Sequence, residues 1–222
     1  MKKKEIDGVL LLEDVPCFDL AQTFECGQCF RWRRVDRPAL ADNAPVSAAL
    51  SLIDAAGGQE TAPGLPVVYE GVVGKSPLRI WQRGQNLVFE PADLKSYQTR
   101  WADYFDLRRD YRTIQRTLAQ DATLARAIRF AGGIRVLRQD FFETLISFIL
   151  SQQSNIPRIR QNIDRLCQLY GEKISWNGRT FAAFPTPERL ARLDEQQIAQ
   201  IHAGYRGRYI LDAARKVAGE EI

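Results

Sequence analysis

Two polar segments of this 222-residue chain carry side chains that could bind an anion or a nucleic-acid base. The first, residues 151–160, opens with five polar residues that join an apolar stretch to the start of a helix. Free amide groups at a helix start favour an anion, and Arg158 and Arg160 stand in the next turn. Glutamine and asparagine there can also pair with base edges. The alternative is a capped corner between two helices with no ligand.

The second segment, residues 203–209, places Tyr205 and Tyr209 four positions apart, with Arg206 and Arg208 between them. Residues four apart share one face of a helix, so the tyrosines could stack on bases while the arginines hold phosphates. An amphipathic helix with its tyrosines in the core and its arginines in solvent has the same spacing. The spacing alone leaves both interpretations open.

A third segment, residues 23–32, contains Gly27 just before an aromatic stretch. Glycine lets the backbone approach another group closely, although by itself it indicates only a tight turn. Cys26 and Cys29 in this segment have C-x-x-C spacing, but no second cysteine pair accompanies them and His202 is the only histidine. We therefore expect no metal and no redox site, and we expect no cofactor, since the sequence has no nucleotide-binding glycine motif.

Composition places these segments in an ordinary globular protein, with 45% hydrophobic and 26% charged residues. No apolar run is long enough to cross a membrane, and four cysteines are too few for a disulfide scaffold at this length. We therefore expect a protein of the cytoplasm without membrane association. Of the 31 basic residues, 24 are arginines, and residues 101–222 hold the positive excess. A polyanionic partner and simple solvated helix faces both account for that excess.

Hydrophobic periodicity divides the chain into a first part of short strands and a second part of helices. The predicted strands, punctuated by glycine and proline, indicate an antiparallel sheet and comprise residues 8–12, 29–34, 67–73, 78–82 and 87–90. Residues 36–66 are rich in alanine, proline and glycine, and we expect them to be a surface excursion.

The predicted helices begin after Pro91 and comprise residues 93–105, 110–118, 122–130, 141–150 and a segment that follows Asn155. Residues 141–150 are apolar on nearly every face, which predicts a helix buried on all sides. Ser154 or Asn155 is the expected N-cap of the next helix, which has Pro157 in its first turn and Gly171 beyond its end.

Read together, these segments resemble the 8-oxoguanine DNA glycosylase family over nearly the whole chain, with the motifs in the same order and at matching distances. The resemblance lies in residues 19–32, 134–140, 148–149, 155–159, 165–168 and 204–209. It implies an α+β fold, with a TATA-binding-protein-like antiparallel sheet over residues 1–105 packed on an incomplete helical glycosylase domain over residues 106–222. The implied activity is excision of 8-oxoguanine from duplex DNA followed by lyase cleavage of the abasic strand.

The resemblance also implies roles for individual residues. Lesion recognition falls on the backbone carbonyl of Gly27, which would accept the N7 proton that 8-oxoguanine carries and guanine lacks. DNA binding and contacts around the opposite cytosine fall on Gln153, Asn155, Arg158, Tyr205 and Arg206. Gln153 departs from the asparagine-rich run of the family, so opposite-base selectivity stays open.

The family's lysine nucleophile and catalytic aspartate match no residue here and are expected beyond Ile222. Lys173 and Lys216 lie in the wrong segments to replace the lysine. We expect a truncated, monomeric form of a repair glycosylase, nucleoid-associated if bacterial, without lyase activity of its own. Because the family's hairpin segment would normally enclose the helix over residues 141–150, we also expect part of the apolar surface of that helix to face water in this chain. A non-catalytic module that binds damaged DNA is the alternative, and a plain interaction domain is a third.

Overall fold

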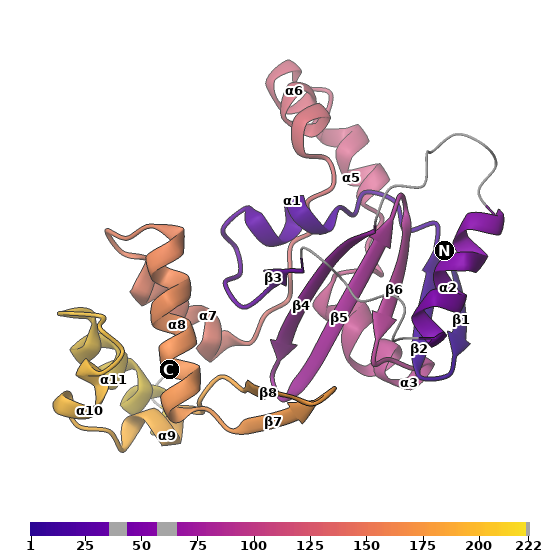
Figure 1. Cartoon of the computed structure of the whole chain (residues 1–222). Coiled ribbons are helices and arrows are strands. Elements are labelled where there is room, and N and C mark those ends of the chain that lie inside the picture. The colour runs from indigo at the N-terminus through magenta and orange to yellow at the C-terminus, as the bar shows by residue number, and fades with distance from the viewer. Residues whose placement is uncertain (36–43, 57–65, 221–222) are drawn as a thin grey trace. The chain divides into compact units, whose positions relative to one another are not determined.

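The computed structural model describes residues 1–35, 44–56 and 66–220 (Figure 1). The chain forms two compact units. The sheet unit comprises Met1–Gln28, Trp32–Gly71 and Leu78–Arg138, and the helical unit comprises Cys29–Arg31, Val72–Pro77 and Gln139–Ile222. An antiparallel sheet and a helical region are both present, so the predicted α+β class is confirmed. The expected boundary between domains after residue 105 is a statement about which parts of the chain fold separately, and it stays a prediction.

Six strands form one sheet, in the spatial order β1-β2-β6-β5-β4-β3. Their bounds are β1 (Lys2–Ile6), β2 (Val9–Glu13), β3 (Arg33–Arg34), β4 (Val67–Val73), β5 (Ser76–Arg83) and β6 (Asn86–Glu90). Leu10, Leu11 and Leu12 of β2 pair in antiparallel register with Phe89, Val88 and Leu87 of β6. The periodicity did not predict β1 because its lysine-rich sequence is almost entirely exposed, as is usual for an edge strand.

Two expectations for this part of the chain are wrong. The strand predicted over residues 29–34 is confined to Arg33–Arg34, because Phe30 and Trp32 are buried in different clusters instead of on one strand face. The excursion over residues 36–66 contains the helix α2 (Ala44–Ala56), whereas residues 36–43 and 57–65 lie outside the described part. Val46, Ala49, Leu50 and Ile53 of α2 recur at helical spacing and pack against Val9, Leu11, Trp81 and Val88 of the sheet.

Trp32 is the centre of an aromatic cluster in the sheet unit. Its ring stacks on Phe24 at 4.3 Å between centroids, and its indole N–H donates to the Tyr104 hydroxyl at 3.0 Å. Gly71 lies against the same ring, and a Cβ there would come within 2.6 Å of it. Glycine is therefore required at position 71 by the close approach of the indole.

Short helices complete the sheet unit, and several begin at an aspartate N-cap. They are α1 (Leu20–Glu25), α3 (Leu94–Ser96), the π-helical turn η1 (Tyr97–Trp101), α4 (Ala102–Tyr104), α5 (Tyr111–Leu118) and α6 (Ala122–Ala131). Asp19, Asp93, Asp110 and Asp121 accept hydrogen bonds from free amides at the starts of α1, α3, α5 and α6. The predicted helices over residues 110–118 and 122–130 are confirmed.

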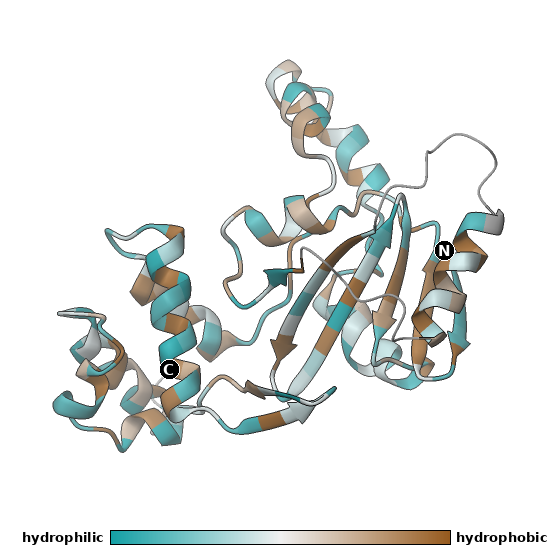
Figure 2. Ribbon diagram, viewed as in Figure 1, coloured by the Kyte–Doolittle hydropathy of each residue, from teal (hydrophilic) through white to brown (hydrophobic). Residues whose placement is uncertain are grey.

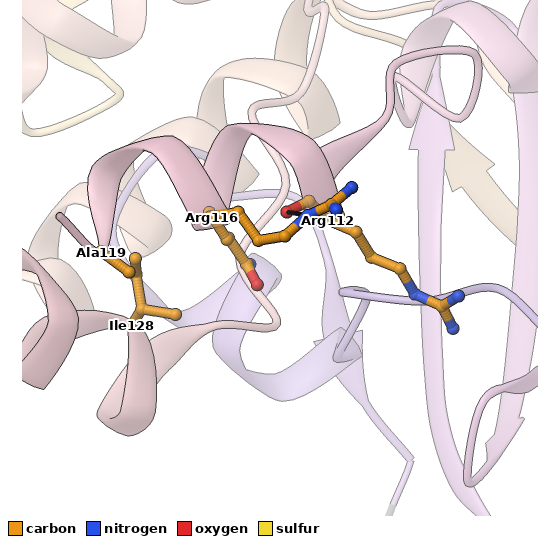
Figure 3. Close-up of a pocket in the computed structure, with 5 residues that line it drawn as sticks. Arg112, Arg116, Ala119 and Ile128 are labelled. Carbon is orange, nitrogen blue, oxygen red and sulfur yellow. Dashed lines mark hydrogen bonds between the residues drawn. The ribbon is translucent and has the colours of Figure 1, made fainter.

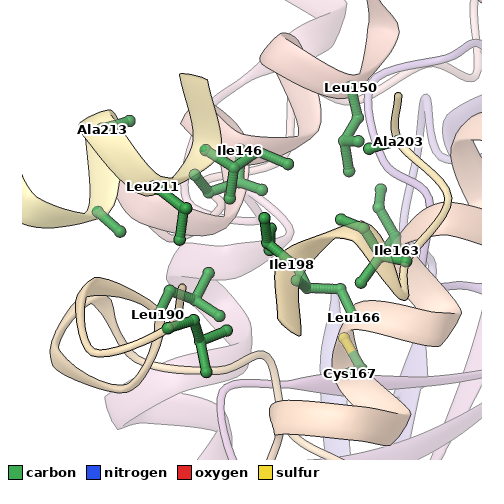
Figure 4. Packing of buried hydrophobic residues seen from close by; sticks show 14 of the residues in the cluster. Ile146, Leu150, Ile163, Leu166, Cys167, Leu190, Ile198, Ala203, Leu211 and Ala213 are labelled. Atoms are coloured by element: carbon green, nitrogen blue, oxygen red, sulfur yellow. The ribbon is translucent and has the colours of Figure 1, made fainter. Parts of the chain in front are cut away.

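The helical unit packs five helices around one apolar core (Figure 4). Its elements are α7 (Phe141–Ser151), α8 (Ile156–Tyr170), β7 (Lys173–Trp176), β8 (Arg179–Ala182), α9 (Pro187–Ala191), α10 (Glu195–Ala199) and α11 (Arg206–Ala218). Alternation of apolar and polar residues along α8 is visible in Figure 2. Asn155 is the N-cap of α8 and Gly171 follows its end, as expected.

Helix α7 is buried on one face only, so burial on all sides is wrong for this helix, whereas the expectation that part of its apolar surface faces solvent is confirmed. Phe142, Ile146 and Leu150 enter the core, whereas Phe141 is 61% and Phe148 is 65% exposed. The core partners of α7 lie on the side where residues 142, 146 and 150 recur every four positions. The opposite face therefore presents two large apolar side chains to solvent.

An ion pair anchors the start of α7 within the helical unit. Arg31 lies 3.4 Å from Glu143, and its guanidinium also donates to the Ala182 carbonyl. Burial raises the pKa of Glu143, and the charge of Arg31 opposes that shift. The amide of Glu143 donates to the Asp140 side chain, which is the N-cap of the helix.

Candidate nucleic-acid interface

The turn between α7 and α8 brings together the polar residues singled out in the sequence. Gln153 occupies the left-handed backbone region with φ of 48°. Asn155 accepts a hydrogen bond from the Arg158 amide at 3.0 Å, and this cap leaves the exposed Arg158 side chain on the first turn of α8. Between them, the Ser154 hydroxyl is buried with no hydrogen-bond partner in the described part of the chain.

The Arg206 side chain supports this turn through hydrogen bonds to its backbone. Its side chain is 6% exposed, and its guanidinium donates to three backbone carbonyls, those of Gln152, Gln153 and Ala203. No carboxylate pairs with Arg206 within the described residues. The buried guanidinium therefore adds an uncompensated positive charge beneath the Gln152–Gln153 turn, which favours an anionic or carbonyl-rich ligand.

Tyr205 and Tyr209 lie side by side at the start of α11. Their rings meet edge to face at 6.2 Å, and their side chains are 52% and 47% exposed. The Arg206 guanidinium lies 4.7 Å from the Tyr205 ring, and Arg208 donates to the Tyr209 hydroxyl at 3.2 Å. The amphipathic alternative is thus wrong for Tyr205, Tyr209 and Arg206, since both tyrosines face solvent and the arginine is buried.

A groove of about 360 Å³ lies beside this cluster, between α7 and α11. Leu145, Phe148 and Ile149 form its apolar side, and Tyr205, Arg206 and Gln152 lie at its edge together with Tyr209, Asp212, Ala213 and Lys216. Both exposed tyrosine rings and Gln152 of the turn therefore border this groove. We call the residues Gln152–Arg158 and Tyr205–Tyr209 together the tyrosine–arginine cluster.

Gly27 lies in the sheet unit, in the loop that follows α1. Its backbone has φ of 89°, a conformation that favours glycine, and a Cβ there would meet no atom within 4 Å. Within the described residues, no donor is hydrogen-bonded to the Gly27 carbonyl. The position therefore combines a glycine-specific backbone, open space and an unused acceptor.

Other parts of the described chain contain no further group of predicted site residues. A hollow of about 600 Å³ in the sheet unit is lined by Arg112, Gln115, Arg116, Ala119 and Ile128, none of them a predicted site residue (Figure 3). The described residues contain no cluster of metal-binding side chains and no helix long and apolar enough to span a membrane. His202 is an exposed residue with φ of 62° before α11.

Comparison with known proteins matches both parts of the chain to repair glycosylases. A family model described as the N-terminal domain of 8-oxoguanine DNA glycosylase matches residues 10–145, which is more than half of the chain. The chain belongs to the 8-oxoguanine DNA glycosylase family. A second model, the HhH-GPD superfamily of base excision DNA repair proteins, matches residues 146–222.

Two curated relatives bear the names of repair glycosylases. The N-glycosylase/DNA lyase of Saccharomyces cerevisiae is 41% identical over 91 residues, or 40% of this chain and 24% of that protein. OGG1 of Arabidopsis thaliana is 40% identical over 87 residues, or 39% of this chain and 23% of that protein.

Solved structures of 8-oxoguanine glycosylases superpose on the whole chain. MBOgg1 in complex with a low-affinity DNA ligand has a TM-score of 0.82 at 35% identity, covering 100% of this chain and 66% of that chain. The Clostridium acetobutylicum 8-oxoguanine glycosylase/lyase, bound to duplex DNA with cytosine opposite 8-oxoguanine, has a TM-score of 0.84 at 28% identity. That match covers 100% of this chain and 67% of that chain. This chain thus spans about two thirds of the length of these solved structures and aligns with about a quarter of the length of the two curated relatives.

The structure gathers Gln153, Asn155, Arg158, Tyr205 and Arg206 in one unit, whereas Gly27 lies in the other. The resemblance assigned no role to Gln152 or Tyr209, although both border the site. The four-residue spacing of the tyrosines had already indicated Tyr209 as a residue that could stack on a base. No signal in the sequence identified the Gln152 carbonyl, because it binds Arg206 across 54 positions of the chain.

Proposed function

We propose that this chain recognises 8-oxoguanine in duplex DNA and serves base excision repair, as part of a DNA glycosylase with abasic-site lyase activity. The observation that carries the proposal is the tyrosine–arginine cluster, which presents two solvent-facing tyrosine rings above a buried, carboxylate-free arginine. Membership in the 8-oxoguanine DNA glycosylase family supports it. The Clostridium relative, which was solved with cytosine opposite the lesion, supports the same partner.

The cluster would act on the strand opposite the lesion. When the damaged base leaves the stack, Tyr205 would fill the gap and offset part of an unstacking cost of a few kcal/mol. Arg206 and the Gln153 side chain would bind acceptors of the orphaned cytosine, and Asn155 would hold the first turn of α8. Arg158, exposed on that turn, would contact phosphate or the cytosine itself.

Gly27 would read the lesion. Its carbonyl is free to accept the N7 proton of 8-oxoguanine, whereas guanine would leave that acceptor unpaired. Leaving one buried polar group unpaired costs roughly 1–3 kcal/mol, which suffices to discriminate between two nearly identical bases.

Tyr205→Ala is expected to lower the preference for damaged over undamaged duplex by roughly ten-fold, because base–aromatic stacking contributes about 1–3 kcal/mol per base. Fluorescence anisotropy with 8-oxoguanine:cytosine and guanine:cytosine duplexes at one fixed salt concentration measures the ratio. Tyr205→Phe keeps the ring and is the matched control, which should keep the preference. Equal loss of affinity for both duplexes would assign Tyr205 a structural role.

A second prediction concerns chemistry. We expect residues 1–222 alone to form no covalent adduct with 8-oxoguanine DNA under borohydride, because no residue among them matches the family's nucleophilic lysine. The measurement is a gel-shift assay after reduction, with a complete family enzyme as the positive control. An adduct that survives replacement of both Lys173 and Lys216 would contradict the expectation.

The alternative function, damage binding without catalysis, shares the same cluster and the same DNA partner. A trapped adduct would exclude it for this chain. Preferential binding of the damaged duplex without any adduct is compatible with it, and also with a glycosylase whose nucleophile lies outside these residues. Gel filtration of the same sample tests the expected monomer.

A further inference from the structure

The side-chain amide of Gln28, in the loop that carries Gly27, makes three hydrogen bonds. Its Nε2 donates to the Thr23 carbonyl at 2.9 Å and to the Arg135 carbonyl at 2.8 Å. Its Oε1 accepts from the Leu137 amide at 2.9 Å. Both N–H donors and the carbonyl of this amide are therefore engaged.

These three bonds connect the loop to two different parts of the sheet unit. Thr23 belongs to α1, five positions before Gln28, whereas Arg135 and Leu137 are 107 and 109 positions further along the chain. The Thr23 hydroxyl also accepts a hydrogen bond from the Arg135 amide at 3.2 Å, so Thr23 and Arg135, both partners of Gln28, are bonded to each other as well. Gln28 thus ties the end of the Gly27 loop to a segment that is itself fixed.

The geometry of the peptide bond carries this restraint to Gly27. The Gly27 carbonyl lies in the planar peptide unit that ends at the Gln28 Cα, so fixing Gln28 limits the directions in which that carbonyl can point. Glycine explores more backbone conformations than other residues, and the space where a Cβ of residue 27 would lie is open. Without the hydrogen bonds of the Gln28 side chain, the Gly27 carbonyl would lose this restraint on its direction.

We propose that Gln28 is a positioning residue that holds the Gly27 carbonyl in the direction needed to accept the N7 proton of 8-oxoguanine, so that it sets selectivity for the lesion instead of overall DNA affinity. This inference rests on the proposed function, in which Gly27 reads the lesion. The cause is preorganisation, since a carbonyl that is already oriented loses less freedom when the base binds.

The test compares Gln28→Ala with Gln22→Ala in the full 222-residue chain. Gln22 is a matched control, because its Oε1 accepts from the Gly133 amide at 2.7 Å and so ties α1 to the same distant segment without adjoining Gly27. Anisotropy measures the dissociation constants for 8-oxoguanine:cytosine and guanine:cytosine duplexes at one salt concentration. Circular dichroism establishes that each variant is folded.

The selectivity ratio is the dissociation constant for the guanine:cytosine duplex divided by that for the 8-oxoguanine:cytosine duplex. We expect Gln28→Ala to lower this ratio about ten-fold, equivalent to about 1.4 kcal/mol, with little change in the affinity for undamaged DNA. Gln22→Ala should keep the wild-type ratio. Gln28→Met keeps the length of the side chain and loses all three hydrogen bonds, so a similar fall in the ratio is expected. It serves as the test if the alanine variant does not fold.

Three outcomes would overturn the inference. An unchanged ratio in folded Gln28→Ala would contradict it while leaving the proposed function intact. An equal loss of selectivity in Gln22→Ala would show that any weakening of the contact between α1 and the segment around residues 133–137 lowers selectivity, so Gln28 would have no specific role. A wild-type chain with no preference for the damaged duplex would overturn the proposed function together with the inference.

Discussion

Arg206→Ala is expected to lower the affinity for 8-oxoguanine duplex roughly 30-fold or more, because removing a buried, hydrogen-bonded charge from an interface costs about 2–5 kcal/mol. The variant loses the bonds to the Gln152, Gln153 and Ala203 carbonyls, so the turn between α7 and α8 loses its support along with its charge. Arg206→Lys should not restore binding, since one ammonium group cannot reproduce the planar guanidinium fork.

Arg208→Ala is the matched control for Arg206. It removes the same charge two positions away, from an exposed side chain that contacts only Tyr209 within the described residues. We expect a loss of a few-fold at most. The salt dependence of binding adds a second readout. Each phosphate contact steepens the slope of log affinity against log salt by about one, so a variant that loses such a contact, for example Arg158→Ala, should show a slope that is shallower by about one. Equal losses for Arg206→Ala and Arg208→Ala would show that charge alone matters.

Arg135→Met is expected to destabilise the sheet unit by about 3 kcal/mol, since it leaves polar groups unpaired and removes a buried cation–π contact. Arg135 is 3% exposed and donates to the Asp106 carbonyl at 2.7 Å and to the Pro16 carbonyl at 2.8 Å. Its guanidinium lies 4.3 Å from the Tyr111 ring. For a chain of this size, the loss corresponds to a fall in melting temperature of about 6–12 °C.

Tryptophan fluorescence during thermal unfolding measures this effect, because Trp32, Trp81 and Trp101 all belong to the sheet unit. Arg138→Met is the control, since Arg138 lies in the same connecting segment, with a side chain 61% exposed and 3.6 Å from Asp106. Because the Arg138 guanidinium is largely exposed to solvent, this ion pair is expected to contribute about 0–1 kcal/mol. Similar melting temperatures for the two variants would contradict a structural role for the buried guanidinium.

Much of the site could be predicted from the sequence because its signals are local. The N-cap Asn155, the proline-containing first turn of α8 and the left-handed glycine at position 27 follow from rules that act over a few residues. The order and spacing of the motifs predicted the family, which the comparisons confirm. Periodicity also predicted α5, α6 and most of the sheet.

What only the tertiary structure decided is which side of each element is buried and which distant groups meet. The spacing of Tyr205, Arg206 and Tyr209 is the same whether tyrosines or arginines face the core, and the buried guanidinium became evident only with its carbonyl partners 53 and 54 positions away. Gln28 bonds across more than 100 positions. Propensity and periodicity describe neighbours along the chain, whereas burial and such hydrogen bonds depend on segments that folding alone brings together.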